Sequence, residues 1–221
     1  MPPGEIGLAD LVRNGTMSPE IAATLAVAAA ERRSLLVIAV PRGAGKTTLL
    51  RAALAHRPAG MPVHALQRYD DGSLGIPVRR DGGYLFLNEI ADTGFLDYFW
   101  GEEIRRVFSR LDGFSLATAL HAPGVDAAFE VIGGWNQVPD EQASRIDLAV
   151  YIEVGGTARA PRRRVAEVRE IDGVRDRRPS GRTLHRWLTA DDRFETVDAP
   201  VLIGSATPGG IASRIAEFAR G

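Results

Sequence analysis

The chain has 221 residues, a formal net charge of −1 at pH 7, and 45% hydrophobic against 25% charged residues. These values fit a globular protein with a substantial core, and a charge near zero excludes a global field that attracts nucleic acid or an anionic membrane. The absence of cysteine excludes disulfides, thiolate nucleophiles and cysteine-ligated metal sites.

Residues 1–33 are expected to form a helical lead-in. We expect a short helix over Ile6 to Val12, and Ser18-Pro19-Glu20 is a start signal for a second helix that runs to about Arg33. The segment has no basic-then-apolar leader, and Ile21 to Ala30 is too short and too rich in alanine to span a bilayer. We therefore expect a cytoplasmic protein that does not span a membrane.

A strand, a glycine loop and a helix start follow one another in SLLVIAVPRGAGKTTLL, residues 34–50. The apolar run Leu35 to Ala39 is typical of a strand buried on both faces of a parallel sheet. The order strand, glycine loop, Gly-Lys-Thr and helix predicts a P-loop, which binds phosphate through backbone N–H groups and a helix N-terminus. The predicted nucleotide-binding residues are Pro41, Arg42, Gly43, Ala44, Gly45, Lys46, Thr47 and Thr48.

Lys46 is the only lysine in the chain, and the slim ammonium group that a phosphate loop needs is poorly replaced by a guanidinium. We expect Lys46 to reach the β- and γ-phosphates and the Thr47 hydroxyl to ligate Mg²⁺. The usual first glycine of the pattern is Val40 here. The alternative is a glycine-rich turn without a ligand.

A second strand is expected at Val63 to Leu66, followed by a turn over Tyr69 to Ser73 and a returning hairpin strand over Leu74 to Arg80. The two carboxylates of Asp70 and Asp71 are compatible with a metal site, but the sequence Asp-Asp-Gly is more typical of a turn.

The stretch Gly83 to Glu89 is an apolar strand that ends in an acidic residue. Downstream of a P-loop this pattern indicates a Walker B strand, which delivers a carboxylate to Mg²⁺ and to the attacking water. Because Asn88 takes the place of the usual Asp, Glu89 is the candidate carboxylate. The alternative is an exposed acidic strand end.

A third central strand is predicted from Phe114 to His121, and its carboxyl end would line the ligand crevice of an open α/β sheet. His121 is therefore a candidate site residue. The alternative is a purely structural role.

The three arginines at 162–164 are compatible with contact to phosphate or acidic lipid, although a solvated edge strand is the usual interpretation. The other expected features are aromatic core residues at 93–100, helices at 102–111, 123–132 and 209–219, a loop at 133–136, strands at 146–154 and 165–171, a polar loop at 172–182, and a small packed element with His185 to Leu188 and Phe194.

With these segments placed, the chain resembles the bacterial type II and type IV secretion and pilus-assembly ATPases, in their C-terminal RecA-like motor domain. PRGAGKTTLL resembles that family's Walker A, and LFLNEIAD its atypical Walker B, in which Glu carries the function. GFSLATALHAPGVDAAFEVI resembles its His box, and IDLAVYIEV with RRRVAEVREI its closing β-hairpin. Order and spacing agree from about Ile21 to Asp172.

The resemblance implies an α/β fold of the RecA-like P-loop NTPase class, with a mainly parallel central sheet flanked by helices and a C-terminal antiparallel hairpin. It implies an NTPase core over 34–172, with 173–221 as an appendage that ends in a helix. It also implies ATP and Mg²⁺ as ligands, with catalysis by Lys46, Glu89 and His121. Glu89 would orient or deprotonate water and hold Mg²⁺ with Thr47, directly or through water, and His121 would sense the γ-phosphate.

The expected partners are nucleotide, further copies of the chain in a ring, and a secretion or pilus membrane component. The chain departs from the family in Val40, in Asn88, and in Gln67 where an acidic residue is expected. Family members also carry a large N-terminal domain, whereas in this sequence only the helical lead-in comes before the predicted core. ATP is favoured over GTP because a sole lysine leaves no guanine-reading motif. Two other hypotheses are a nucleotide-dependent binding module with negligible turnover and, less favoured, a P-loop small-molecule kinase.

Overall fold

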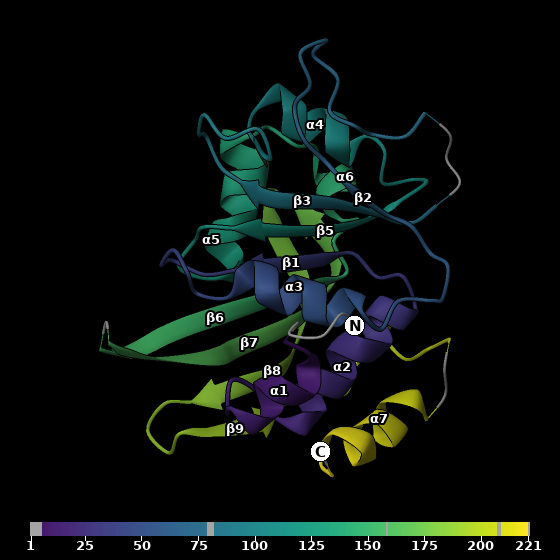
Figure 1. The fold of residues 1–221 in the computed structure, drawn as a ribbon. Coiled ribbons are helices and arrows are strands. Elements are labelled where there is room, and N and C mark those ends of the chain that lie inside the picture. The colour runs from purple at the N-terminus through teal and green to yellow at the C-terminus, as the bar shows by residue number, and fades with distance from the viewer. Residues whose placement is uncertain (1–5, 79–81, 158, 207–208, 221) are drawn as a thin grey trace.

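A mixed sheet with helices on both faces forms the centre of the molecule (Figure 1). The computed structural model describes residues 6–78, 82–157, 159–206 and 209–220. In this part of the chain the helices are α1 Leu8–Arg13, α2 Pro19–Ala30, α3 Lys46–Leu54, α4 Glu102–Phe108, α5 Val125–Glu130, the π-helix η1 Val131–Trp135, α6 Asp140–Ala143 and α7 Gly210–Phe218. The strands are β1 Leu35–Ile38, β2 Val63–Ala65, β3 Tyr84–Ile90, β4 Tyr98–Phe99, β5 Ser115–Leu120, β6 Leu148–Thr157, β7 Ala160–Arg175, β8 Arg178–Leu188 and β9 Arg193–Thr196.

The sheet has the strand order β2-β3-β5-β1-β6-β7-β8-β9, with β4 added beside β3. The strands from β2 to β6 pair in parallel, as do β3 and β4, and β6 to β9 form an antiparallel extension. The expectation of a mainly parallel sheet with a C-terminal hairpin is confirmed at this level of detail. Because β1 lies between β5 and β6, its carboxyl end opens near the middle of the sheet.

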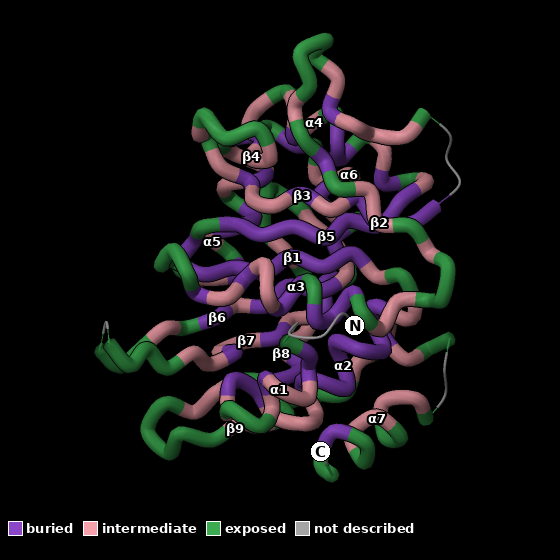
Figure 2. Tube along the Cα trace, in the orientation of Figure 1, coloured by how far each residue is buried: buried purple, intermediate pink, exposed green. Residues whose placement is uncertain are grey.

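Strand β1 separates two hydrophobic cores. Leu35 and Val37 face one core, with residues of α1, α2, α3 and α7, whereas Leu36 and Ile38 face the other, with residues of α4 and α5. The side chains alternate because successive Cβ atoms of a strand point to opposite faces. Burial on both sides explains the unbroken apolar run in the sequence, and Figure 2 shows β1, β3 and β5 mostly buried.

The antiparallel extension corrects the expectation of a polar loop at 172–182. Strand β7 runs through to Arg175, and a two-residue turn at Asp176 and Arg177 leads directly into β8. Both turn residues have positive φ, 50° and 64°, as two-residue hairpin turns of the primed type require. His185 and Phe194 therefore lie in strands β8 and β9 of the same sheet. How the chain divides into domains stays a prediction.

Three other expectations need correction. Residues 74–78 form no strand, and the rest of the predicted hairpin strand lies outside the described residues, although the turn before it is confirmed by the bond from the Tyr69 N–H to the Ser73 carbonyl. The loop expected at 133–136 is largely the π-helix η1. Of the aromatic stretch, Phe99 is buried but Phe95 is 57% exposed, so this stretch belongs only partly to the core.

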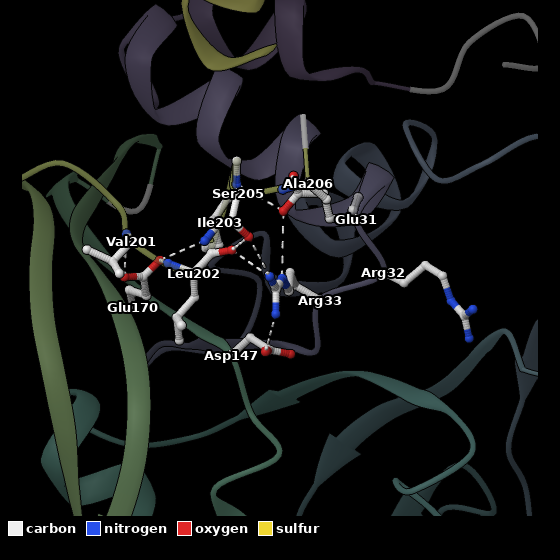
Figure 3. A network of polar contacts seen from close by, with 12 residues as sticks. Glu31, Arg32, Arg33, Asp147, Glu170, Val201, Leu202, Ile203, Ser205 and Ala206 are labelled. Atoms are coloured by element: carbon white, nitrogen blue, oxygen red, sulfur yellow. Dashed lines mark hydrogen bonds and ion pairs between the residues drawn. The ribbon is translucent and has the colours of Figure 1, made fainter. Parts of the chain in front are cut away.

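Charged side chains fix the segment that leads to α7 (Figure 3). The buried carboxylate of Glu170 accepts hydrogen bonds from the backbone N–H groups of residues 201–203, each at 2.9 Å. Arg33 donates to the Leu202 carbonyl and pairs with Asp147, and Glu31 accepts from two further N–H groups of the segment. A carboxylate that accepts several N–H groups makes strong, charge-assisted bonds, and these bonds fix residues 201–206. Helix α7, which follows this segment, packs against α2.

A buried histidine joins the extension to α2. The His185 ring lies 2.9 Å from the Thr24 hydroxyl through Nε2 and 3.2 Å from the Thr196 hydroxyl through Nδ1. Burial lowers the pKa of His185 to about 4, because the charged imidazolium loses its hydration. The ring is therefore neutral in the folded protein at pH 7.

We predict that the free energy of unfolding falls as the pH drops from about 6.5 to about 4. In this window the unfolded chain takes up a proton on His185 and the folded chain does not, a difference on the order of 3 kcal/mol over the whole window. Urea unfolding at pH 7 and pH 5 measures the loss. His185→Gln, which keeps hydrogen-bonding capacity without titrating, should flatten this dependence. Equal pH dependence in parent and variant would contradict the assignment.

Candidate functional site

The loop between β1 and α3 depends on two glycines in the left-handed region. Gly43 has φ 72° and Gly45 has φ 93°, a conformation that side chains with a Cβ rarely adopt. A Cβ at Gly43 would meet no atom within 4 Å. The requirement for glycine at this position is therefore conformational rather than steric.

The loop leaves a set of backbone donors without partners. Among the described residues, no acceptor is found for the N–H groups of Gly43 to Thr48. Helix α3 has nine residues and begins at Lys46, so its first-turn N–H groups and the positive end of its dipole lie at this loop. Together the glycine loop and the helix start offer an anion a group of free donors.

Lys46 and Glu89 meet beside these donors. The Lys46 Nζ lies 3.4 Å from Glu89 Oε2, and the two side chains are only 7% and 16% exposed. Lys46 comes from the first turn of α3 and Glu89 from the end of β3. Since β1 and β3 both pair in parallel with β5, their carboxyl ends open at the same edge of the sheet.

Asn88 occupies the position where a Walker B strand usually has Asp, and it contacts the site through Thr47. The Thr47 hydroxyl donates to Asn88 Oδ1 at 3.2 Å, so the amide holds that side chain in place. Thr47 and Glu89 line the same hollow as Lys46, and both carry side-chain oxygen, the ligand that Mg²⁺ prefers. No group of three or more His, Cys, Asp or Glu side chains suited to a metal occurs in the part of the chain that the structure describes.

A hollow of about 410 Å³ lies over this arrangement, and we call it the β3-side pocket. It is lined by Arg42, Gly43, Ala44, Gly45, Lys46, Thr47, Thr48, Glu89, Phe95 and Tyr98. Burial and the neighbouring Glu89 carboxylate raise the pKa of the Tyr98 hydroxyl, which therefore stays protonated as a neutral donor. The structure brings together most of the residues that the sequence predicts for the phosphate site.

A second hollow, of about 490 Å³, lies on the other side of the loop, and we call it the β7-side pocket. Arg163 of β7 crosses between it and the loop, and donates to the Gly43 carbonyl from Nε at 3.2 Å and Nη2 at 2.9 Å. The sequence favours a solvated edge strand for the arginine run at 162–164. That holds for Arg162, which is 70% exposed, whereas the Arg164 side chain is 15% exposed and pairs with Asp192.

Two predicted site residues line neither pocket. His121 is exposed at the end of β5, and Pro41 is exposed in the loop. Their roles stay predictions. The Asp70-Asp71 pair is part of a turn, as favoured from the sequence: Asp71 Oδ1 accepts from the Ser73 N–H at 2.9 Å, and this hydrogen bond lowers the pKa of Asp71.

No helix in the described ranges combines the length and apolar character needed to cross a bilayer.

Comparison with known proteins gives little beyond a distant structural resemblance. No protein family's sequence profile matches the chain, and no curated protein matches it. Among solved structures, the chain is similar to the VirB11 ATPase of the Brucella suis type IV secretion system, crystallised with sulphate, at 17% identity and a TM-score of 0.48. The match covers 74% of this chain and 54% of that protein. A likeness at this level identifies neither a ligand nor an activity.

We predict that Arg163→Ala loosens the glycine loop, because it removes both hydrogen bonds to the Gly43 carbonyl. The ¹⁵N order parameters of Gly43 to Gly45 should fall from about 0.85 towards about 0.6. Arg162→Ala is the matched control, since the partner of Arg162 within the described ranges is Asp192, at 3.7 Å, and it should leave the loop unchanged. Unaltered order parameters in Arg163→Ala would show that the arginine does not hold the loop.

Proposed function

We propose that this protein is a Mg²⁺-dependent ATPase of the RecA-like P-loop class, related to the secretion and pilus motors. The observation that carries the proposal is the contact between Lys46 and Glu89, 3.4 Å apart beside glycine-loop N–H groups for which the described residues offer no acceptor. A buried cation beside free donors is suited to phosphate, and a carboxylate beside it is suited to activate water.

The phosphates would lie on the N–H groups of Gly43 to Thr48. Lys46 would turn from Glu89 to the β- and γ-phosphates, whose several negative charges attract its ammonium group more strongly than the single carboxylate does. The N–H groups contribute without reorganisation, because Gly43 and Gly45 already hold the loop in its left-handed conformation.

The residues present fit Mg²⁺. This ion usually takes one or two protein oxygens together with substrate phosphates and water, and here Thr47 would be a direct ligand and Glu89 a ligand directly or through water. Asn88 would keep the Thr47 hydroxyl in position, as its 3.2 Å contact does in the structure. When bound, the ion neutralises charge on the β- and γ-phosphate oxygens.

Hydrolysis would use Glu89 as the residue that orients water. The water oxygen bonds to the γ-phosphorus, the bond from that phosphorus to the β–γ bridging oxygen breaks, and Glu89 accepts the proton from water. ADP leaves with the bridging oxygen, and inorganic phosphate is the second product. His121, which follows the end of β5, would sense or stabilise the γ-phosphate.

The partners follow from the same proposal. ATP is the nucleotide, and a head-to-tail ring of copies would complete the site between subunits. A secretion or pilus component at a membrane would be the protein that the motor drives.

We predict that substitutions of Lys46 and Glu89 separate binding from hydrolysis. Lys46→Ala should weaken Mg·ATP binding about 30- to 100-fold, because it removes a charge-assisted contact and leaves the Glu89 carboxylate facing phosphate. Glu89→Gln should keep the affinity within about threefold and slow hydrolysis by about 100-fold or more. Calorimetric titration and phosphate release on the same samples give both quantities.

The controls make the same charge changes at exposed positions. Arg51→Ala on α3 matches Lys46→Ala, and Glu102→Gln on α4 matches Glu89→Gln. Both should behave as the parent. Equal hydrolysis by Glu89→Gln and the parent would exclude Glu89 as the residue that activates water. Tight ATP binding without phosphate release from the parent would instead favour a nucleotide-dependent binding module.

A further inference from the structure

We propose that the β7-side pocket binds the nucleoside half of the nucleotide, with the base between the N-terminal segment 6–16 and the β6–β7 hairpin. The inference rests on the proposed function, since it extends the phosphate site to the rest of the ligand. It assigns to the N-terminal segment of this chain a direct part in recognising the base.

The direction of the ligand follows from which residues line which pocket. Lys46, Thr47 and Glu89 line the β3-side pocket and are absent from the β7-side lining. The terminal phosphate and the metal ligands therefore belong on the β3 side. Both pockets share Thr48 and the loop residues Gly43 to Gly45, so a ligand that lies across the loop enters both.

The β7-side pocket has the chemistry that a purine base requires. Its apolar walls come from Ile6, Leu11, Ile152 and Pro161, and its volume of about 490 Å³ lies within the range of small-molecule sites. Asn14 adds a polar group to this lining. Because its Oδ1 already accepts from the Thr16 N–H and hydroxyl, at 3.1 and 2.6 Å, its NH₂ group remains as a donor to a base.

The charge of the pocket suits the first phosphate. Arg164 is committed to Asp192, with two hydrogen bonds of 2.9 and 3.0 Å. The guanidinium of Arg163 instead donates to the backbone carbonyl of Gly43, and no carboxylate partner is found for it among the described residues. This cation lies beside the loop, so its positive charge attracts the α-phosphate while its hydrogen bonds to the Gly43 carbonyl keep the loop in place.

The walls of the pocket are already in place. The Val165 N–H donates to the Thr16 carbonyl at 2.8 Å, which ties the N-terminal segment to β7. Leu8 and Leu11 are buried in the core on the same side of the sheet. A site whose walls are fixed before binding loses less entropy when the ligand binds.

The rival position for the base is against Phe95 and Tyr98 in the β3-side pocket. A base stacked there would occupy the space beside Lys46 and Glu89. The terminal phosphate would then lie on the β7 side, away from the only lysine and from Thr47. The placement of Lys46 therefore favours the β7-side pocket for the base.

A matched pair of truncations tests the inference. Ile6 is 49% exposed and Phe95 is 57% exposed, so Ile6→Ala and Phe95→Ala each shorten an exposed apolar side chain of one pocket with little risk to the fold. Calorimetry compares Mg·ATP with Mg·tripolyphosphate, which has no base. The parent should bind ATP at least about tenfold more tightly. Ile6→Ala should weaken ATP binding roughly three- to fivefold without changing tripolyphosphate binding, and Phe95→Ala should leave the ratio of the two affinities as it is in the parent.

Photolabelling with 8-azido-ATP gives an independent measurement on the parent protein. The label is expected on residues 6–16 or 160–163. Label on residues 93–98, loss of the ATP preference in Phe95→Ala alone, unchanged ATP affinity in Ile6→Ala, or equal affinity of the parent for both ligands would overturn the inference while leaving the phosphate site intact. Failure of both ligands to bind would overturn the proposed function and this inference with it.

Discussion

The ion pair between Lys46 and Glu89 is the contact on which the account of this protein depends. Placing two mostly buried charges 3.4 Å apart costs desolvation free energy that their attraction only partly offsets. The pair exists because β1 and β3 run parallel on either side of β5 and end at one edge of the sheet. A pair of this kind is weak evidence for stability. It lies beside glycine-loop N–H groups that have no acceptor among the described residues, and this combination fits the phosphate site that we propose.

Much of this centre could be predicted from the sequence, because its signals are local. The apolar run of β1 and the Gly-Lys-Thr helix start of α3 each lie within a few residues, and the structure has both elements as expected. Strand β3, Tyr84–Ile90, carries Asn88 and Glu89 just before its end, one residue short of the last strand position. That Asn88 accepts from Thr47 could not be predicted, since it depends on how two strands and a helix align in space.

The C-terminal third was harder to predict for two physical reasons. The turn at Asp176 and Arg177 has positive φ at both residues but contains neither Gly nor Asn, so the usual hairpin signal is missing. Arg162 to Arg164 look equivalent in sequence, yet each has different surroundings in the structure, and Arg163 lies against the glycine loop. Arg163 bonds to Gly43, which is distant in the chain. Arg164 pairs with Asp192, which comes after the turn at Asp176 and Arg177 that the sequence does not signal.

We propose above all that the N–H groups of residues 43–48 bind the phosphates of a nucleotide. An amide chemical-shift titration of the ¹⁵N-labelled protein with Mg·ATP observes those groups one by one. We expect saturable shifts that are largest at Gly43 to Thr48, together with changes at Glu89. Titration to millimolar nucleotide with these amides unmoved, or with shifts confined to another part of the sheet, would contradict it.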